Sequence, residues 1–339
     1  MSDLPFPDVS LHNVAETASP DWTDGGHRLC RVPAAVGANL NVDARERLRH
    51  PTGAELRFVP ESSDATATVT LSAPEETVVQ PFWGPFQPSE PVEIGPEPTT
   101  HEFSLPPRVR DLDPDVAAGG AFDHRVCRLR FDGWVPAAVH DVSGAVRAPT
   151  NDELPRARYL AYGTSITEGA WASAPHLSYV ARTARHLGVD ALNLGCSGSA
   201  FCEPAMADYI AGREDWDVAT LALSVNMANR GFTLEQFRER AAALVDTVTR
   251  AHPETPVVCV TLFPYHADVV AGDDPERAAD FRAALRTIVA DADHQNLHIV
   301  EGADLMDATC LTSDVLHPGD DGMIQIGRAL AERLAPLLG

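Results

Sequence analysis

Proline is distributed unevenly along this chain, and the distribution limits what each half can fold into. Nineteen of the 27 prolines lie at or before Pro155. Because proline is poorly tolerated inside helices and central strands, the first half is predicted to form loops and short strands. Several of its runs alternate polar with apolar residues, as strands do: AELRFVP, DATATVTLSAP, ETVVQPFW, THEFSLP and HRVCRLRFDG. We expect residues 1–150 to form an antiparallel, jelly-roll-like β-sandwich, with RVPAAVGANLNVDARERL as an exception that can hold a short helix.

The second half has a different periodicity, in which each short apolar run is followed by a longer helical pattern. ARYLAY precedes HLSYVARTARHL, DVATLALSV precedes TLEQFRERAAALVDTVTRAH, and PVVCVTL precedes PERAADFRAALRTIVADA. Thr233 is predicted to begin one of these helices and Gly188 to end another. Such alternation predicts a parallel sheet covered by helices on both faces. We therefore expect an α/β domain over residues 151–339, with five parallel strands in a flavodoxin-like, three-layer α/β/α arrangement.

The chain is strongly acidic, with 49 Asp and Glu against 26 basic residues and a formal net charge of -23. Every basic side chain other than histidine is arginine, because the sequence contains no lysine. Such a chain repels phosphate backbones, so nucleic acid is not an expected partner. A surplus of carboxylates suits a protein that works in molar salt. A GC-rich genome would explain the missing lysine but not the surplus of acid.

Nothing in the sequence predicts a membrane span or a secretory signal. No apolar run approaches about 18 residues, and the first residues lack a basic and an apolar region, so we expect a cytoplasmic protein without a membrane partner. No two cysteines form a CxxC pair, so a zinc ribbon is not expected and the thiols are predicted to be reduced. The six are Cys30, Cys127, Cys196, Cys202, Cys259 and Cys310. Whether the protein forms a homo-oligomer stays open, because no interface can be read from the sequence.

A candidate nucleophile follows the first predicted parallel strand, in the stretch Tyr162–Gly169 (YGTSITEG). A glycine two residues before Ser165, on a sharp strand-to-helix turn, can expose the serine hydroxyl beside free backbone N–H groups. By itself the pattern also fits an ordinary N-cap serine in a tight turn. The G-x-S-x-G elbow of α/β-hydrolases is absent, because position 167 is threonine.

A second candidate stretch, Ser313–Gly319 (SDVLHPG), lies just before the last predicted helix. Asp314 and His317 are three residues apart, which can place the carboxylate near the imidazole and fix its tautomer. By itself this pair also fits an Asp-stabilised turn. Together the two stretches are predicted to meet at the carboxyl edge of the sheet.

These stretches resemble the first and last conserved blocks of the SGNH hydrolases, also called the GDSL family. The family blocks G-D-S and D-x-x-H-P correspond to Gly163-Thr164-Ser165 and to Asp314 through Pro318. Within the family, the chain resembles more closely a branch with Gly-Thr-Ser and an added N-terminal β-sandwich, which includes acyl-esterases and an acyltransferase of antibiotic biosynthesis. That likeness covers nearly the whole chain.

The resemblance implies two further site residues. In the stretch Asn193–Gly198 (NLGCSG), Gly198 matches the family glycine whose N–H enters the oxyanion hole, with Gly195 as an alternative. The family block G-x-N-D corresponds to Ser224 through Met227, so Asn226 matches the asparagine donor, with Asn229 as its rival. Ser224 stands where the family has glycine, and Met227 stands where it has aspartate. These departures bear on the geometry of the turn, but the asparagine donor is kept.

The resemblance implies a serine esterase that cleaves small acylated compounds, acetylated sugars among them. Ser165 would be the nucleophile, with His317 and Asp314 completing the triad, and with the Ser165 N–H, Gly198 and Asn226 as the oxyanion hole. No metal or organic cofactor is expected. An acyltransferase with a small-molecule acceptor and a non-catalytic carbohydrate-binding protein are the alternatives.

Other residues fit both structural and functional roles. Glu168 can line the site, but acids are favoured at helix starts anyway. His176 and His186 are spaced for one helix, and His266 begins an HxD pair without a visible third metal ligand. The aromatic stretch Pro81–Phe86 (PFWGPF) fits a pocket-covering loop or a sugar platform, and equally the core of the sandwich or a domain interface.

Overall fold

The computed structural model describes residues 5–223 and 225–338. The chain divides into two compact units, one made of Met1–Ala34 and Leu48–Arg156, the other of Ala35–Arg47 and Ala157–Gly339. A short segment, residues 35–47, therefore leaves the first unit and belongs to the second. It contains most of α1 (Ala34–Gly37) and all of α2 (Val42–Arg47), in the stretch predicted to hold a helix.

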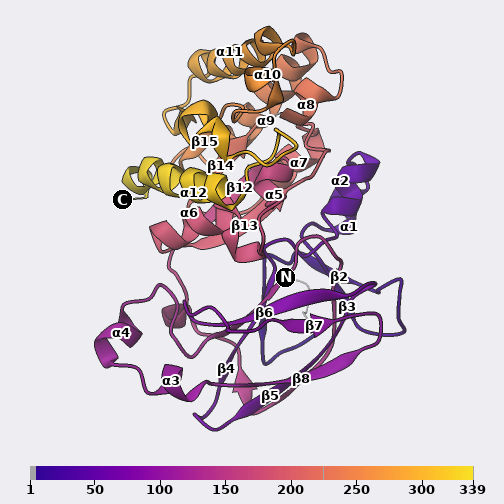
Figure 1. Cartoon of the computed structure of the whole chain (residues 1–339), viewed down its shortest axis with the longest axis vertical. Helices are drawn as coiled ribbons and strands as arrows, with labels where there is room; N and C mark the ends of the chain where they lie inside the picture. Colours follow the sequence, from indigo (N-terminus) through magenta and orange to yellow (C-terminus); the bar gives the residue numbers. More distant parts are fainter. Residues whose placement is uncertain (1–4, 224, 339) are drawn as a thin grey trace. The chain divides into compact units, whose positions relative to one another are not determined.

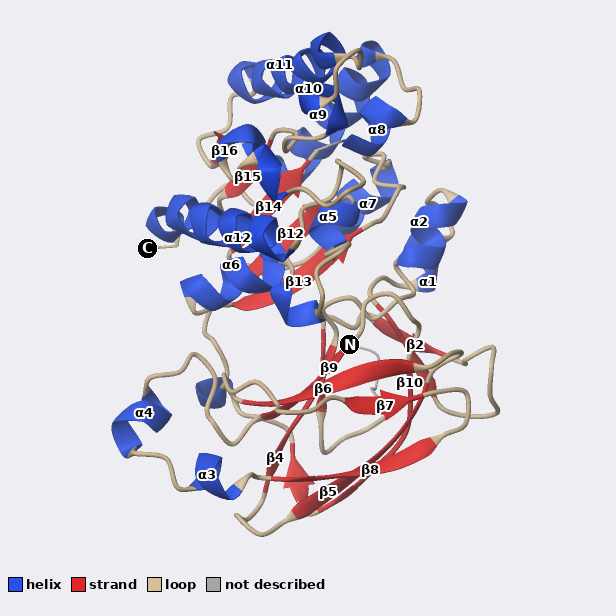
Figure 2. Cartoon of the chain, in the orientation of Figure 1, coloured by secondary structure: helices blue, strands red, loops and turns tan. Residues whose placement is uncertain are grey.

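The first unit is built from two antiparallel sheets, whose strands are drawn in red in Figure 2. One sheet has the order β1-β4-β9-β6-β7, with β11 paired to β4, and comprises β1 (Ser10–His12), β4 (Glu55–Pro60), β6 (Thr77–Trp83), β7 (Val92–Ile94), β9 (Cys127–Phe131) and β11 (Val146–Arg147). The other has the order β2-β3-β10-β5-β8 and comprises β2 (Glu16–Ala18), β3 (His27–Cys30), β5 (Thr66–Ser72), β8 (Thr99–Ser104) and β10 (Ala138–Gly144). Its helices are short: α3 (Pro107–Arg110), α4 (Pro114–Ala118) and the 3-10 turn η1 (Asn151–Glu153).

The two sheets share one hydrophobic core. Leu56 and Phe58 come from one sheet, Val69 and Leu71 from the other, and all four are fully buried in the same cluster. In β5 the residues alternate between more and less buried positions, as expected where one face of a strand meets the core. The β-sandwich predicted from the short, proline-bounded strands is therefore present.

The second unit contains a five-stranded parallel sheet, as predicted. Its order is β13-β12-β14-β15-β16, with β12 (Arg158–Gly163), β13 (Asp190–Gly195), β14 (Val218–Ala222), β15 (Val257–Val260) and β16 (Leu297–Val300). Figure 1 shows β12 between β13 and β14. Gly163 pairs with Gly195, so β12 and β13 end level with each other. The loops that follow these strands consequently start at the same edge of the sheet.

Helices connect these strands, and their ends follow the sequence patterns. They are α5 (Ser165–Glu168), α6 (Tyr179–Leu187), α7 (Pro204–Ala211), α8 (Val225–Asn229), α9 (Leu234–Ala251), α10 (His266–Val269), α11 (Pro275–Asp291) and α12 (Asp320–Leu334), with 3-10 turns η2 (Pro175–Leu177), η3 (Gly302–Asp304), η4 (Ala308–Cys310) and η5 (Ala335–Leu337). Thr233 and Gln236 form a capping box that begins α9, and Gly188, at φ +69°, ends α6. Both predicted helix ends are confirmed.

Contacts among these helices form two groups. Helix α6 packs against α12, whereas α7 and α11 both pack against α9. Within α9, Phe237, Leu244 and Val248 recur on one buried face. In the part of the chain that the structure describes, no helix is both long and apolar enough to cross a membrane.

The prediction that His176 and His186 share one helix is wrong. His176 lies in η2, while His186 lies near the end of α6. Between them Ser178 accepts a hydrogen bond from the Ala181 N–H and so begins α6 as its N-cap. A capping serine therefore separates two elements that spacing alone would join.

Candidate active site

Ser165 stands at the carboxyl edge of the parallel sheet, where the chain turns sharply from strand to helix. Thr164 alone separates β12 from α5, and Ser165 is the first residue of α5. The serine is 5% exposed, and its Oγ lies 2.8 Å from Nε2 of His317. Because Ser165 is in the first turn, its own N–H has no partner within the helix.

His317 comes from the loop between β16 and α12, together with Asp314. Nδ1 of His317 lies 2.7 Å from Oδ2 of Asp314. The other carboxylate oxygen, Oδ1, accepts from the backbone N–H of Leu316 and of His317 at 2.9 and 3.0 Å, and from the Thr312 hydroxyl at 2.8 Å. The loop thus wraps around Asp314 and holds it in position, and the two predicted stretches meet as a continuous Ser-His-Asp chain of hydrogen bonds.

The charge on Asp314 determines which nitrogen of His317 carries the proton, and so which group donates in each hydrogen bond of the Ser-His-Asp series. Partial burial alone would raise the pKa of the Asp314 carboxyl, but hydrogen bonds from the His317 N–H and ring, the Leu316 N–H and the Thr312 hydroxyl lower the pKa well below its usual range. Asp314 is therefore ionised and accepts the proton on Nδ1 of His317. Nε2 is then the basic nitrogen, and it can accept the hydroxyl proton of Ser165.

Strained backbone gathers in the loops around the site. Among the described residues other than glycine, four have a positive φ, and three of them lie in these loops: Trp171 (67°), Cys202 (54°) and Val315 (55°). A β-branched or bulky residue rarely adopts this conformation, so surrounding contacts must hold it. Trp171 is 63% exposed, and its indole nitrogen lies 3.2 Å from Nδ1 of His317, beside the bond to Asp314.

The structure distinguishes between Gly195 and Gly198, the two candidate N–H donors to the oxyanion. The N–H of Gly195 already donates to Oδ1 of Asn193 at 2.8 Å. The N–H of Gly198 has no acceptor among the residues that the structure describes. Gly198 has φ +67°, and a Cβ there would lie 2.7 Å from a guanidinium nitrogen of Arg230. Its positive φ therefore favours glycine at position 198, whereas the flexible Arg230 side chain could move away from a Cβ.

Asn226 is likewise better placed than its rival Asn229. Asn226 is 8% exposed, follows β14 in α8, and accepts the Ala200 N–H through Oδ1 at 3.2 Å. With its oxygen engaged, the amide nitrogen remains as the donor. Asn229 is exposed and its amide nitrogen lies 3.3 Å from Nε2 of His266. Ser224, the predicted departure from the family glycine, lies outside the described residues.

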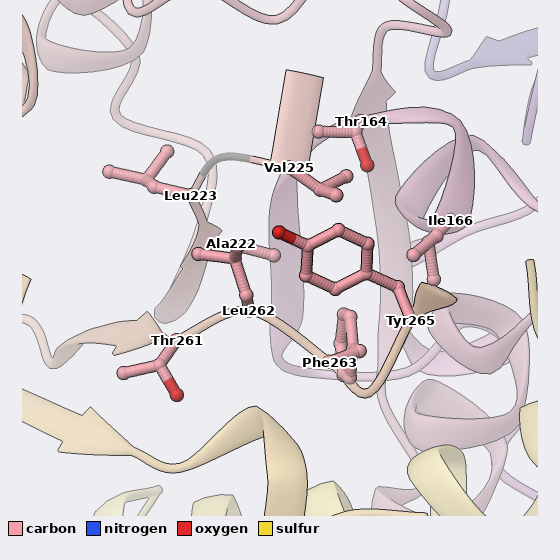
Figure 3. A pocket seen from close by; sticks show the side chains of 9 residues that line it. All are labelled: Thr164, Ile166, Ala222, Leu223, Val225, Thr261, Leu262, Phe263 and Tyr265. Carbon is pink, nitrogen blue, oxygen red and sulfur yellow. The ribbon is translucent and has the colours of Figure 1, made fainter. Parts of the chain in front are cut away.

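A mostly apolar hollow adjoins the nucleophile turn (Figure 3). It is lined by Thr164, Ile166, Ala222, Leu223, Val225, Thr261, Leu262, Phe263 and Tyr265. Thr164 and Ile166 flank Ser165 in the chain, and Val225 precedes Asn226. Burial raises the pKa of Tyr265 to about 12, so its hydroxyl stays protonated near neutral pH.

The remaining candidates have structural partners. His266 bonds Asp273 through Nδ1 at 2.8 Å, and Asp268 pairs with Arg282 at 2.6 Å, so the HxD residues point to different partners. Across the described residues, no group of three or more His, Cys, Asp or Glu could hold a metal ion. Trp83, in the aromatic stretch, is 6% exposed and packs edge-on against Phe58 in the sandwich core.

Sequence reasoning missed two residues that contact the site loops, Asn41 and Arg47. Asn41 donates to the Ser199 carbonyl at 2.9 Å, and Arg47 pairs with Glu168 at 2.5 Å. Both lie in the 35–47 segment, more than 120 positions before their partners in the chain. The one available indication was the predicted helix in an otherwise strand-rich half.

Comparisons with known proteins agree with this architecture. Residues 157–335 match the model of the GDSL-like Lipase/Acylhydrolase family. A salicylyl-acyltransferase from a tetracycline biosynthetic pathway has the same fold, at 17% identity and a TM-score of 0.78, over 98% of this chain and 95% of that chain. No curated protein matches the sequence.

Two further solved structures share the fold over 98% of this chain. A GDSL-like lipase from Bacteroides ovatus aligns at 18% identity and a TM-score of 0.69, over 96% of its own length. A family two carbohydrate esterase from Clostridium thermocellum aligns at 16% identity and a TM-score of 0.64, over 99% of its length. At such identities the likeness establishes the fold alone, whereas the family model covers more than half of the chain.

Proposed function

Because this chain belongs to the GDSL-like lipase/acylhydrolase family and is a serine esterase of that type, we propose that Ser165 is its nucleophile, with His317 and Asp314 completing a catalytic triad. The observation that carries the proposal is the pair of short contacts, 2.8 Å from Ser165 Oγ to His317 Nε2 and 2.7 Å from His317 Nδ1 to Asp314 Oδ2. A nucleophile, a base and a group that orients the base are thus within hydrogen-bond reach of one another.

The proposed reaction is acyl transfer in two halves. Nε2 of His317 takes the proton of Ser165 as Oγ attacks the ester carbonyl carbon, and the carbonyl oxygen becomes an oxyanion. The protonated His317 then gives that proton to the alcohol oxygen, the ester C–O bond breaks, and the acyl group stays on Ser165. Water attacks the acyl-enzyme in the second half, again losing its proton to His317, and Ser165 is restored. Asp314 stabilises the imidazolium in both halves.

Three donors are proposed to stabilise the oxyanion: the N–H of Ser165, the N–H of Gly198 and the side-chain amide of Asn226. The support is that each donor closely follows the carboxyl end of one of three neighbouring strands, respectively β12, β13 and β14. Donors fixed in advance cost no reorganisation when charge develops in the transition state.

The proposed substrates are carboxylic esters of small compounds, acetylated sugars among them. Structural neighbours described as carbohydrate esterases support sugar esters as substrates. An acyltransferase is the second candidate, and it is supported by the neighbour described as a salicylyl-acyltransferase. In a transferase an alcohol would replace water in the second half of the reaction. A non-catalytic carbohydrate-binding protein is disfavoured, because the acid, base and nucleophile remain together.

Hydrolysis of p-nitrophenyl acetate by the full chain and by Ser165→Ala tests the proposal. We expect nitrophenol release from the wild type and its loss in the variant, with both proteins folded by circular dichroism. Turnover that survives the substitution would refute the nucleophile. An inactive but folded wild type that forms product when an alcohol acceptor is added would identify the transferase.

Four further predictions accompany this proposal. We propose a catalytic domain over 151–339 with flavodoxin-like layers, and a jelly-roll-like domain over 1–150 from which residues 35–47 leave to join the second unit. We also propose a cytoplasmic location, and salt adaptation supported by the net charge of -23. Excess carboxylate repulsion is screened in molar salt, where the Debye length is about 3 Å. The unfolding midpoint in urea should therefore rise between low and molar KCl. A midpoint that does not change would refute salt adaptation.

A further inference from the structure

The loop between β13 and α7, residues 196–203, carries the proposed oxyanion donor Gly198, and it is contacted by the 35–47 segment. Asn41 accepts the Ala44 N–H through Oδ1 at 2.9 Å, and so caps the start of α2. Its amide nitrogen donates to the Ser199 carbonyl at 2.9 Å and also bonds the Glu203 carboxylate. A single side chain thus both begins α2 and anchors it to this loop. The Cys196 thiol adds a contact to the Ala44 carbonyl at 3.7 Å.

At the other end of α2, Arg47 meets a buried carboxylate beside the nucleophile. Nη2 of Arg47 lies 2.5 Å from Oε1 of Glu168, and Nε lies 3.3 Å from Oε2. The Glu168 side chain is fully buried, and the Arg47 side chain is 18% exposed. A buried carboxylate is costly unless it is paired and hydrogen-bonded. Arg47 therefore supplies the counter-charge for a carboxylate that water does not reach.

Glu168 uses the same carboxylate to hold the loop. Its Oε2 accepts the backbone N–H of Ser197 at 2.8 Å, and Ser197 is bonded directly to Gly198. Glu168 is also the last residue of α5, whose first residue is Ser165. The carboxylate thus joins the helix of the nucleophile to the peptide that precedes the oxyanion donor. A Cβ at Gly195 would lie 2.2 Å from the Glu168 N, so glycine lets the two segments touch.

We infer that Arg47 and Glu168 are positioning residues, which hold Ser197 so that the Gly198 N–H faces the oxyanion. The inference rests on the proposed function, because it concerns the same oxyanion hole. Neither side chain is assigned a contact with the substrate. Loss of the Arg47 charge removes the guanidinium group that holds the Glu168 carboxylate, and the carboxylate then turns toward water. Ser197 loses its acceptor as a result, and a displacement of about 1 Å at a reacting centre costs about 10²-fold in rate.

The test uses the full chain with Arg47→Met, Arg47→Lys and Arg45→Met. Arg45 lies in the same helix and is exposed, so Arg45→Met is the matched control. For Arg47→Met we expect kcat to fall by about 10- to 100-fold with KM within about twofold, because the donor acts only in the transition state. Affinity for an alkyl boronic acid, which forms a tetrahedral adduct on serine, should fall by a similar factor. Arg47→Lys should recover part of kcat, and Arg45→Met should resemble the wild type.

A double substitution keeps the inference testable even where Arg47→Met unfolds the chain. Glu168→Gln with Arg47→Met removes both charges but leaves an amide oxygen to accept the Ser197 N–H. We expect it to restore folding and part of kcat relative to Arg47→Met alone. The inference is overturned if activity falls only with the folded fraction, if KM changes in place of kcat, or if boronate affinity stays at the wild-type level. Failure of the proposed function would look different, because Ser165→Ala would then retain activity.

Discussion

Glu55 in the first unit and Glu168 in the second are both buried and paired with arginine, and the two glutamates differ in what else they hold. Glu55, in β4 of the sandwich, meets Arg128 at 2.6 Å, Arg57 at 2.8 Å and Arg130 at 3.2 Å, all of them side chains of β4 and β9. Glu168, in the second unit, shares its carboxylate between Arg47 and a backbone N–H of a site loop. A carboxylate bound only by side chains of its own sheet supports the fold, whereas one bound to a loop can control the geometry of a reaction.

Electrostatics around Glu55 agree with a purely structural role. Burial alone would raise the pKa of the Glu55 carboxyl, but the guanidinium groups of Arg128, Arg57 and Arg130 lower the pKa well below its usual range. The ring of Phe122 lies 3.5 Å from the Arg128 guanidinium carbon and covers it. The comparison predicts that substitutions in the first unit change stability and those around the site change turnover.

Asp314→Asn is the substitution expected to show the largest effect, and that effect should fall mainly on turnover. An amide at this position favours the wrong tautomer of His317, and loss of the equivalent carboxylate in a serine triad lowers kcat by about 10⁴-fold. Steady-state hydrolysis of p-nitrophenyl acetate measures kcat, and the urea midpoint should fall only slightly in comparison, because an amide oxygen can still accept the backbone N–H bonds that Oδ1 accepts. A large loss of stability with unchanged kcat would break the comparison.

Glu55→Gln is expected to show the converse behaviour. Without the carboxylate, three arginines lose their common counter-charge, and breaking a buried ion pair typically costs about 3–5 kcal/mol of unfolding free energy. Urea titrations followed by fluorescence measure this loss, while kcat per folded molecule should stay near the wild-type value. A kcat that falls along with stability would show that the sandwich charges also act on the site.

Asn226→Ala sharpens the assignment within the second unit. Removing one oxyanion donor typically lowers kcat by about 10²–10³-fold, which corresponds to roughly 2.7–4 kcal/mol. Asn229→Ala is the matched control, since that side chain is exposed and bonds His266. Equal effects of the two substitutions on kcat would exclude Asn226 as the specific donor.

Glu153→Gln should give the smallest effect, and one that depends on pH. Bonds from Arg147, together with those from Thr150, lower the pKa of Glu153 from 4.5 to about 2, although burial opposes the shift. A folded pKa below the unfolded one contributes stability above about pH 4.5, and this contribution is lost as pH falls toward 2. Since Arg147 is 39% exposed, salt screening reduces the effect, to roughly 1 kcal/mol.

Urea midpoints measured between pH 2 and 6 test this last prediction. The wild type should be more stable than Glu153→Gln at pH 6, and the two curves should converge toward pH 2. Curves that stay parallel across the whole range would contradict the assignment of this acid-sensitive contribution to Glu153.

Much of the second unit could be predicted from the sequence because its information is local. Each strand is a short apolar run, and Ser165, Asp314 and His317 lie in short stretches beside predicted strand or helix ends. The sequence left Gly195 and Gly198 as alternatives, since only the bond from Gly195 to Asn193 distinguishes them. Helical spacing also gave a wrong prediction for His176 and His186, because the capping residue Ser178 begins a new helix between them.

The role of the 35–47 segment could not be predicted, for a physical reason. Asn41 and Ser199 are 158 positions apart, and Arg47 and Glu168 are 121 apart. A long-range bond between single side chains leaves no periodic pattern near either partner. The sequence could indicate a helix at these residues but not which unit it joins, and the predicted domain over 1–150 accordingly included them.

Membership of residues 35–47 in the second unit also bears on the order in which the chain can fold. A ribosome releases the N-terminal residues first, so β4 through β11 emerge before the partners of Asn41 exist. The equilibrium cost of closing so long a loop grows only with the logarithm of its length, but its closure must wait for residue 199. Strands β4 through β11 are therefore an insertion between the two segments of the second unit, and α2 cannot dock on the site loop until late in synthesis.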